Sequence, residues 1–217
     1  TLEVGDPYAE LVLDPWNDQY IPQSHFPGMP SFPTGQASWH NTAFRTDNPY
    51  FLWTDGSFQK PPTDRLVIYE TLVRDFDEAQ TFQDLINQLD YLEYMGYNAI
   101  ELMPVSEFEG NSSWGYNPNF RFAVDKFYGP KATLKELVNK CHERGIAVIL
   151  DVVPNHSFGT DPLVRLYQNT DGSAASDNPW FNSVAMHPYS PGYDFDHGEP
   201  WTREFWKRVF DFWIEEY

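Results

Sequence analysis

The stretch GIAVILDVVPNH, residues 145–156, decides the fold of this chain. Residues 146–153 form a nearly unbroken apolar run, rich in Val and Ile, with one carboxylate, Asp151. Such a run is typical of a strand that is buried on both faces, as in a parallel sheet. A proline then ends the run, and Asn155 and His156 follow it. In an α/β barrel the active site is built at this end of a strand, although this segment alone would also suit a structural ion pair.

Two similar apolar runs come earlier in the chain, at 66–73 and 99–105. A helical pattern follows each of them, at 81–96 and 133–145. Both patterns open with a capping box and end at a glycine that suits a left-handed cap. After the third strand a long loop, 154–198, leads to a last helix that begins near a proline. This alternation of strands and helices predicts right-handed βαβ units and a parallel sheet.

The pattern favours an α/β fold made of the first three βα units of a (β/α)8 TIM barrel. A doubly wound sheet is the alternative, but no strand is followed by the glycine-rich phosphate turn that would support it. We therefore expect residues 63–217 to be part of a barrel, with strands 1–3 and the long loop 154–198 after strand 3. Residues 1–62 are predicted to be a short N-terminal strand, at 9–13, followed by an irregular connector.

Composition narrows the classes of partner. The 217 residues carry a net charge of −18, which argues against nucleic acid and anionic membranes as partners. No apolar segment reaches the 18 residues that would suggest a membrane span. Cys141 is the single cysteine, so an internal disulfide is excluded and the compartment is not predicted. The aromatic content of 18% is high enough to supply ring faces for flat, partly apolar ligands such as sugars.

Polar and aromatic residues gather in the loops that follow the second and third strands. The turn SWGYNP, residues 113–118, would hold Trp114 and Tyr116 towards a cleft. Asn155 and His156 follow the third strand, and further aromatic, carboxylate and imidazole groups lie in its loop. Rings beside polar groups suit a neutral polyhydroxylated ligand. A zinc site and a Ser–His–Asp triad are disfavoured, because neither an HExxH spacing nor a G-x-S-x-G elbow is present.

Four motifs together resemble the α-amylase superfamily, glycoside hydrolase family 13. They are VIYE at 67–70, MGYNAIELMPV at 95–105, WGYNP at 114–118 and DVVPNH at 151–156. They occur in that family's order and spacing, and the resemblance covers residues 64–217. The segment DPYAELVLDPWNDQY at 6–20 also resembles the junction from an N-terminal β-sandwich in the pullulanase and branching-enzyme subgroup.

The resemblance implies roles for individual residues of the substrate cleft. Tyr116, beside Trp114, would stack on the sugar ring at the point of cleavage, and His156 would hydrogen-bond the hydroxyls of that sugar. Asp151 would hold an arginine that lies beside the nucleophile on the next strand. Asn155 matches a calcium-binding position of many family members. Because the insertion after the third strand is short here, no cofactor is expected, and calcium at Asn155 is the alternative.

The family cleaves or transfers α-glucans with retention, using a carboxylate nucleophile and a carboxylic acid about 5–5.5 Å apart. The family places the nucleophile, the acid and a supporting aspartate on barrel strands 4, 5 and 7, so none is expected within this chain. We therefore expect part of an α-amylase- or pullulanase-type hydrolase that binds an α-glucan oligosaccharide or polysaccharide and packs against the remainder of its own barrel. The alternative is a non-catalytic member of the superfamily that binds glycans or partners.

Overall fold

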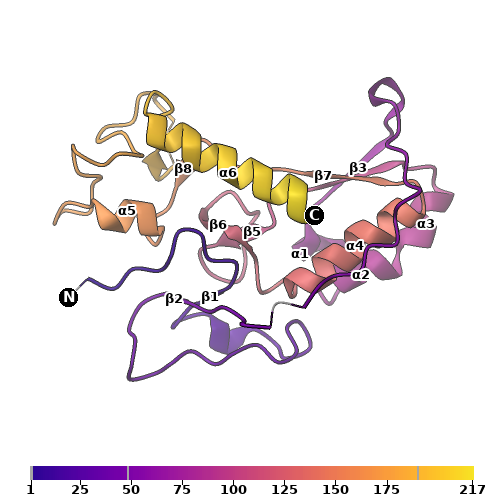
Figure 1. Cartoon of the computed structure of the whole chain (residues 1–217), viewed down its shortest axis with the longest axis horizontal. Coiled ribbons are helices and arrows are strands. Elements are labelled where there is room, and N and C mark those ends of the chain that lie inside the picture. The colour runs from indigo at the N-terminus through magenta and orange to yellow at the C-terminus, as the bar shows by residue number, and fades with distance from the viewer. Residues whose placement is uncertain (1, 48, 190) are drawn as a thin grey trace.

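A parallel three-stranded sheet is the centre of the computed structural model, which describes residues 2–47, 49–189 and 191–217 (Figure 1). Its strands are β3 (Ile68–Thr71), β4 (Ala99–Leu102) and β7 (Ala147–Leu150), in the order β3-β4-β7. The predicted pairing of sequential neighbours is confirmed. Each strand is shorter than its apolar run, because the ladder stops where the chain turns into the next loop or helix; Val73, for example, already begins a helix.

Helices cover the sheet as the alternating pattern predicts, with two local differences. The helix expected over 81–96 divides at Gln88 into two short helices, although the capping box of Thr81 and Asp84 is present. The capping box expected at Thr133 is wrong, because the next helix begins earlier, after the extended Pro130, whose carbonyl accepts from the Thr133 N–H. The helices around the sheet are α1 (Val73–Phe76), α2 (Phe82–Asn87), α3 (Leu89–Tyr94), α4 (Lys131–Glu143) and α6 (Pro200–Glu216).

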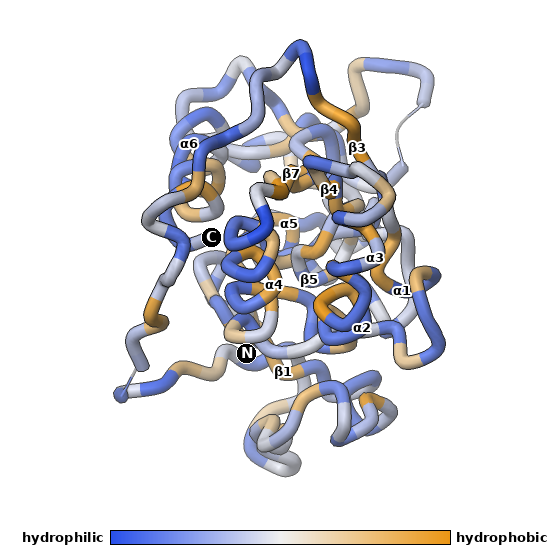
Figure 2. The backbone as a smooth tube through the Cα atoms, turned by 90° about the vertical axis from the view of Figure 1, so that its right-hand side faces the viewer, coloured by the Kyte–Doolittle hydropathy of each residue, from blue (hydrophilic) through white to orange (hydrophobic). Residues whose placement is uncertain are grey.

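The main hydrophobic core lies between the sheet and these helices. The β7 strand is a continuous hydrophobic stretch in Figure 2, whereas the helices alternate between apolar and polar residues. The apolar side chains that α2, α3 and α4 turn inward share one buried core cluster with Ile100 and Leu102 of β4. They include Leu85, Leu89, Leu92, Leu134, Leu137 and Val138. The helices therefore adopt the one-sided amphipathic arrangement that their spacing indicates.

Both predicted loops contain further structure. The connection after β4 folds into an antiparallel hairpin of β5 (Ser106–Phe108) and β6 (Pro118–Val124). Every residue of β6 is buried, including the polar Asn119 and Arg121, so these polar side chains do not mark a solvated strand face. The connection 154–198 contains β8 (His156–Ser157), α5 (Pro162–Leu166) and β9 (Tyr193–Asp194), and β8 pairs with β9.

The N-terminal connector packs beneath the β5–β6 hairpin (Figure 1). Its predicted strand is reduced to β1 (Val12–Leu13), which pairs with β2 (Asn41–Thr42). The connector contains the 3-10 turn η1 (Asp18–Tyr20), and a second one, η2 (Thr63–Arg65), directly follows it. The buried ammonium of Lys126 joins the two regions, because it pairs with Glu107 of β5 and lies 3.3 Å from Asp18 of η1.

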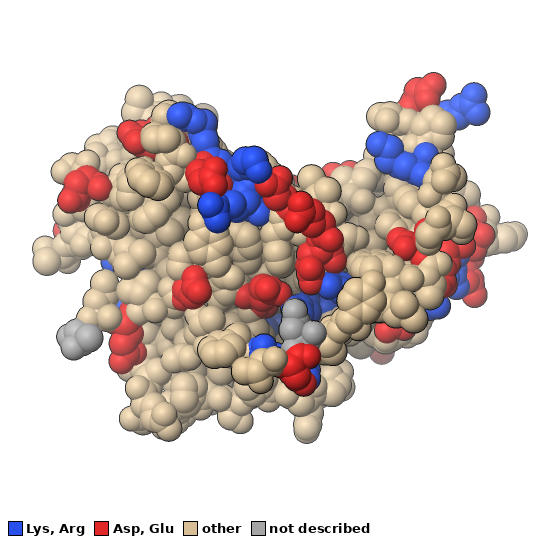
Figure 3. All heavy atoms as spheres, viewed as in Figure 1, with Lys and Arg blue, Asp and Glu red and all other residues tan. Residues whose placement is uncertain are grey.

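The long helix α6 has a solvated outer face with basic and acidic side chains side by side (Figure 3). Two pairs at i,i+4 spacing, Lys207 with Asp211 and Arg208 with Glu204, lie along it. The inner face packs Phe205, Val209 and Trp213 into the core. Over the described part of the chain, helices long and apolar enough to cross a membrane are absent.

Candidate functional site

A tight turn after β5 presents the first candidate residues. Gly115 adopts φ 90°, and a Cβ at this position would lie 2.4 Å from the carbonyl oxygen of Pro104. Only glycine fits there without a backbone shift. The Gly115 N–H also donates to the Ser113 hydroxyl at 2.9 Å. The turn therefore holds Trp114 and Tyr116 in fixed positions on either side of the glycine.

Tyr116 meets Asp151 at the carboxyl end of the sheet. The phenol donates to Oδ2 of Asp151 at 2.5 Å. Asp151 directly follows β7, and its N–H donates to the carbonyl of Leu102 at the end of β4, at 2.9 Å. Burial and the neighbouring carboxylate raise the pKa of Tyr116 to about 12, so the phenol stays neutral and remains a donor. Tyr116 is 39% exposed, which leaves ring surface free for a ligand.

His156 joins this pair from the start of β8. Its Nε2 lies 2.7 Å from the carbonyl oxygen of Tyr116, and its Nδ1 lies 3.1 Å from the side-chain nitrogen of Asn155. Because a carbonyl only accepts, we assign the proton to Nε2, which leaves Nδ1 to accept from the amide. Burial lowers the pKa of His156 below its usual value. The imidazole is therefore neutral around pH 7 and fixes the backbone of Tyr116.

Trp114 and the polar residues that follow His156 in the long connection make no hydrogen bond to Tyr116, Asp151 or the His156 side chain within the part of the chain that the structure describes. Trp114 is 61% exposed at the edge of the turn, which suits a contact made only with a ligand. In the long connection, Asp194 is buried and accepts from Asn182 at 2.8 Å and lies 3.1 Å from Nε2 of His187. His197 Nε2 lies 2.8 Å from the carbonyl oxygen of Pro154. The structure therefore joins these polar groups to one another or to the backbone.

Asn155 lies next to His156 at the start of β8. Its side-chain amide points a nitrogen at His156, which is a donor and not a metal ligand. Within the described ranges, three or more His, Cys, Asp or Glu side chains do not come together in a way that could hold a metal ion. Calcium at Asn155 stays a prediction.

The structure adds a buried residue that the sequence did not single out. Arg121 of β6 forms an ion pair with Asp161, the N-cap of α5, and donates from Nη2 to the carbonyl of His156 at 3.0 Å. A signal for half of this pair was present, because Asp followed by Pro is typical of a helix start. The arginine, between Phe120 and Phe122 of β6, carried no sign of its partner.

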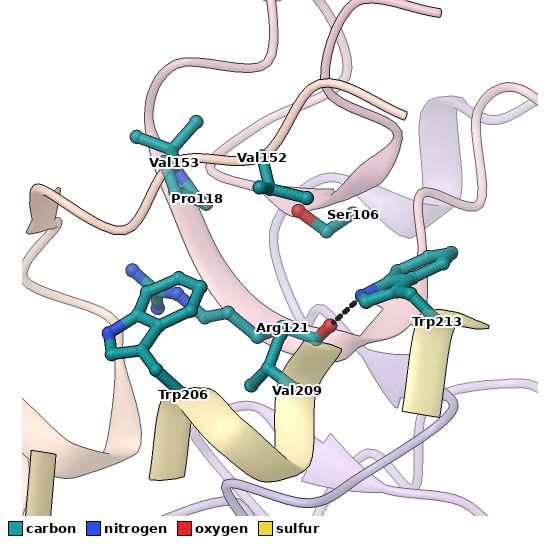
Figure 4. Close-up of a pocket in the computed structure, with 8 residues that line it drawn as sticks. All are labelled: Ser106, Pro118, Arg121, Val152, Val153, Trp206, Val209 and Trp213. Carbon is teal, nitrogen blue, oxygen red and sulfur yellow. Dashed lines mark hydrogen bonds between the residues drawn. The ribbon is translucent and has the colours of Figure 1, made fainter. Parts of the chain in front are cut away.

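A small cavity lies beside this arginine. In Figure 4 the Arg121 side chain runs along Trp206, and its carbonyl accepts from the indole of Trp213 at 2.8 Å. The cavity measures about 10 Å³, enough for about one water molecule. It is too small for a sugar.

Comparison with known proteins is consistent with this geometry. Residues 46–216 match the α-amylase catalytic domain. The chain is 35% identical over 173 residues to a malto-oligosyltrehalose trehalohydrolase of Saccharolobus solfataricus, covering 78% of this chain and 29% of that protein. It is 32% identical over 229 residues to the 1,4-α-glucan branching enzyme GlgB of Shewanella baltica, covering 98% and 27%. The chain thus spans less than a third of the length of these relatives.

Solved structures share the fold. The group B Streptococcus pullulanase SAP in complex with maltotetraose has a TM-score of 0.69 at 23% identity, over 98% of this chain and 30% of that one. An α-amylase from Geobacillus thermoleovorans in complex with acarbose has a TM-score of 0.60 at 22% identity, over 70% and 38%. From its motifs, its fold and these matches, the chain belongs to the α-amylase superfamily, glycoside hydrolase family 13, and covers part of the catalytic domain.

Proposed function

We propose that this chain forms one wall of the substrate cleft of a retaining α-glucan-active hydrolase, as the first three βα units of its barrel. One observation carries the proposal: Tyr116, Asp151 and His156 come from separate elements and meet through two hydrogen bonds of 2.5 and 2.7 Å. They meet at the carboxyl ends of parallel strands, where barrel enzymes build their active sites.

Each residue then has a role in binding. The exposed ring of Tyr116 stacks on the sugar at the cleavage point, and Trp114 extends that aromatic surface. A hydroxyl of the sugar takes the place of the Asn155 amide at Nδ1 of His156. Asp151 holds a cationic side chain beside the nucleophile and keeps the phenol of Tyr116 in position. The nucleophile, the general acid and the supporting aspartate are supplied by barrel strands 4, 5 and 7.

The test is substitution of Tyr116 in the full-length protein. Tyr116→Ala removes the stacking surface, so we expect kcat/KM on maltoheptaose, glycogen or pullulan to fall by about a hundredfold or more. Tyr116→Phe keeps the ring and loses the bond to Asp151, so its loss should be intermediate. Steady-state kinetics and thermal melting would be measured on the same preparations.

A matched aromatic control is Tyr94→Ala, which removes an 87% exposed ring on α3, away from the strand ends. It should leave kcat/KM unchanged. If Tyr116→Ala is as active as the wild type, Tyr116 is not part of the cleft. A wild-type protein that binds glucans and never cleaves or transfers them would favour the non-catalytic alternative.

A further inference from the structure

Arg121 is buried at the junction of three parts of the chain. It lies on β6 and is only 3% exposed. Its guanidinium pairs with Asp161 of α5 and donates to the carbonyl of His156. It also lies over the rings of Phe195 and Trp206, at 5.3 and 5.9 Å from their centroids. The hairpin that carries Tyr116 and the connection that carries His156 therefore share this one cation.

Asp161 is held as firmly as the arginine. It accepts from the Ser157 hydroxyl at 2.5 Å and from the Leu163 N–H at 2.7 Å. A buried ion pair of this kind adds little net stability over an apolar pair of similar size, because desolvation offsets the Coulomb attraction. What the planar guanidinium does supply is direction, since its donors can hold two acceptors at once in a fixed geometry. Those two acceptors are Asp161 and the His156 backbone.

Two hydrogen bonds connect this cation to the candidate cleft. Arg121 holds the main chain of His156 at 3.0 Å, and the imidazole of His156 holds the main chain of Tyr116 at 2.7 Å. Resting on the function proposed above, we propose that Arg121 is a positioning residue of the glucan site. It sets the place of His156 and, through it, the angle at which Tyr116 meets the sugar ring.

The experiment is a double-mutant cycle between Arg121→Lys and His156→Ala in the full-length enzyme. Lysine keeps the charge and can pair with Asp161, but its single ammonium cannot also hold the His156 carbonyl in the same geometry. We expect Arg121→Lys to lower kcat/KM by about tenfold, since small displacements in a site cost rate steeply. In the His156→Ala background the same change should cost less than about twofold, because the route through His156 is already gone.

Controls separate positioning from a general loss of stability. Arg144→Lys makes the same change at a surface pair with Asp90 and should leave kcat/KM unchanged. Leu137→Ala opens a core cavity far from the site and should lower the melting temperature with little change in kcat/KM. Asp161→Asn keeps the helix cap and the side-chain shape, so it tests the same pair if Arg121→Lys does not fold.

A second readout does not depend on activity. The ¹⁵N shifts of the His156 imidazole should report the Nε2–H tautomer in the wild type and a mixture of tautomers in Arg121→Lys. If the wild type has no activity on glucans, the proposed function fails and these shifts still test the inference. Two results would overturn the positioning role of Arg121. One is an unchanged His156 tautomer in Arg121→Lys, and the other is a full tenfold loss of kcat/KM from Arg121→Lys in the His156→Ala background.

Discussion

At the scale of single residues, the hydrogen bond between Asn155 and His156 sets the charge of the imidazole. The Asn155 amide donates to Nδ1, so a proton on that nitrogen would face another donor. Burial acts in the same direction and lowers the pKa of His156. A histidine with a lowered folded-state pKa favours folding above its unfolded pKa of about 6.5, and that contribution is lost as the pH falls through the folded value.

Asn155→Asp should raise the pKa of His156 instead of lowering it. A carboxylate opposite Nδ1 accepts from the imidazolium, so the pKa of His156 should rise above about 6.5, and the variant should gain stability below that pH. NMR titration of the His156 ring measures the pKa directly. Asn155→Ser is the control, because it removes the amide without adding a charge. A titration in Asn155→Asp that matches the wild type would contradict the assigned tautomer.

At the scale of elements, Lys126 joins the connector to the β5–β6 hairpin. It is 2% exposed and lies among Glu107, Asp125 and Asp18. Burial alone would lower the pKa of Lys126, but the surrounding carboxylates outweigh it and the pKa is raised. Burial likewise raises the pKa of Glu107 and of Asp125. One cation therefore balances several carboxylates in the interior.

Lys126→Met should destabilise the protein by about 3–5 kcal/mol, because it leaves buried carboxylates without a cation. The pKa values of Glu107 and Asp125 are higher in the folded than in the unfolded protein, so their protonation stabilises the fold. This stabilisation is complete below the unfolded pKa of about 4 and is lost as the pH rises through the folded pKa values. The gap in melting temperature from the wild type should thus be smaller at pH 4.5 than at pH 7.5. Lys207→Met breaks an exposed pair and should change little. An equal gap at both pH values would show that the carboxylates are not the cause.

At the scale of the whole molecule, one side of the sheet is open. A groove of about 390 Å³ lies beside β7 and α6. Apolar side chains line it, and the strand edge beside it lacks a sheet neighbour among the described residues. The lining includes Val148, Leu150, Val152, Phe210 and Ile214. In a complete barrel this is where the next strand and helix would pack.

Residues 1–217 alone should therefore bind a hydrophobic dye such as ANS and self-associate, because an uncovered apolar strand edge favours pairing. A longer protein that includes the rest of the barrel should do neither. Ile214→Lys, at a position that is 80% exposed, should reduce self-association of the short chain. Dye fluorescence and sedimentation would measure both effects. If residues 1–217 stay monomeric and do not increase the fluorescence of the dye, the groove is already closed.

The sequence predicted those parts of the fold that depend on periodicity. The three strands and their parallel order follow from apolar runs, and the polar residues after those runs place Tyr116 and His156 at one end of the sheet. The hydrogen bond between Tyr116 and Asp151 was not predicted. The β5–β6 hairpin was not predicted, because β6 is buried throughout and its polar residues, Asn119 and Arg121, find their partners only in the folded chain. The partner of Arg121 was not predictable either. Asp161 is 40 residues away, and only the folded chain brings the two together.

That separation has a consequence for the order of folding during synthesis. At about 5–20 residues per second, a ribosome needs roughly 2–8 seconds to make the 40 residues between Arg121 and Asp161. During that interval the guanidinium has no carboxylate to accompany it into the interior, so the hairpin cannot complete its packing. The nascent β5–β6 hairpin therefore waits until α5 has left the exit tunnel. Any pause of translation within this window would leave an unfinished, aggregation-prone intermediate for chaperones to protect.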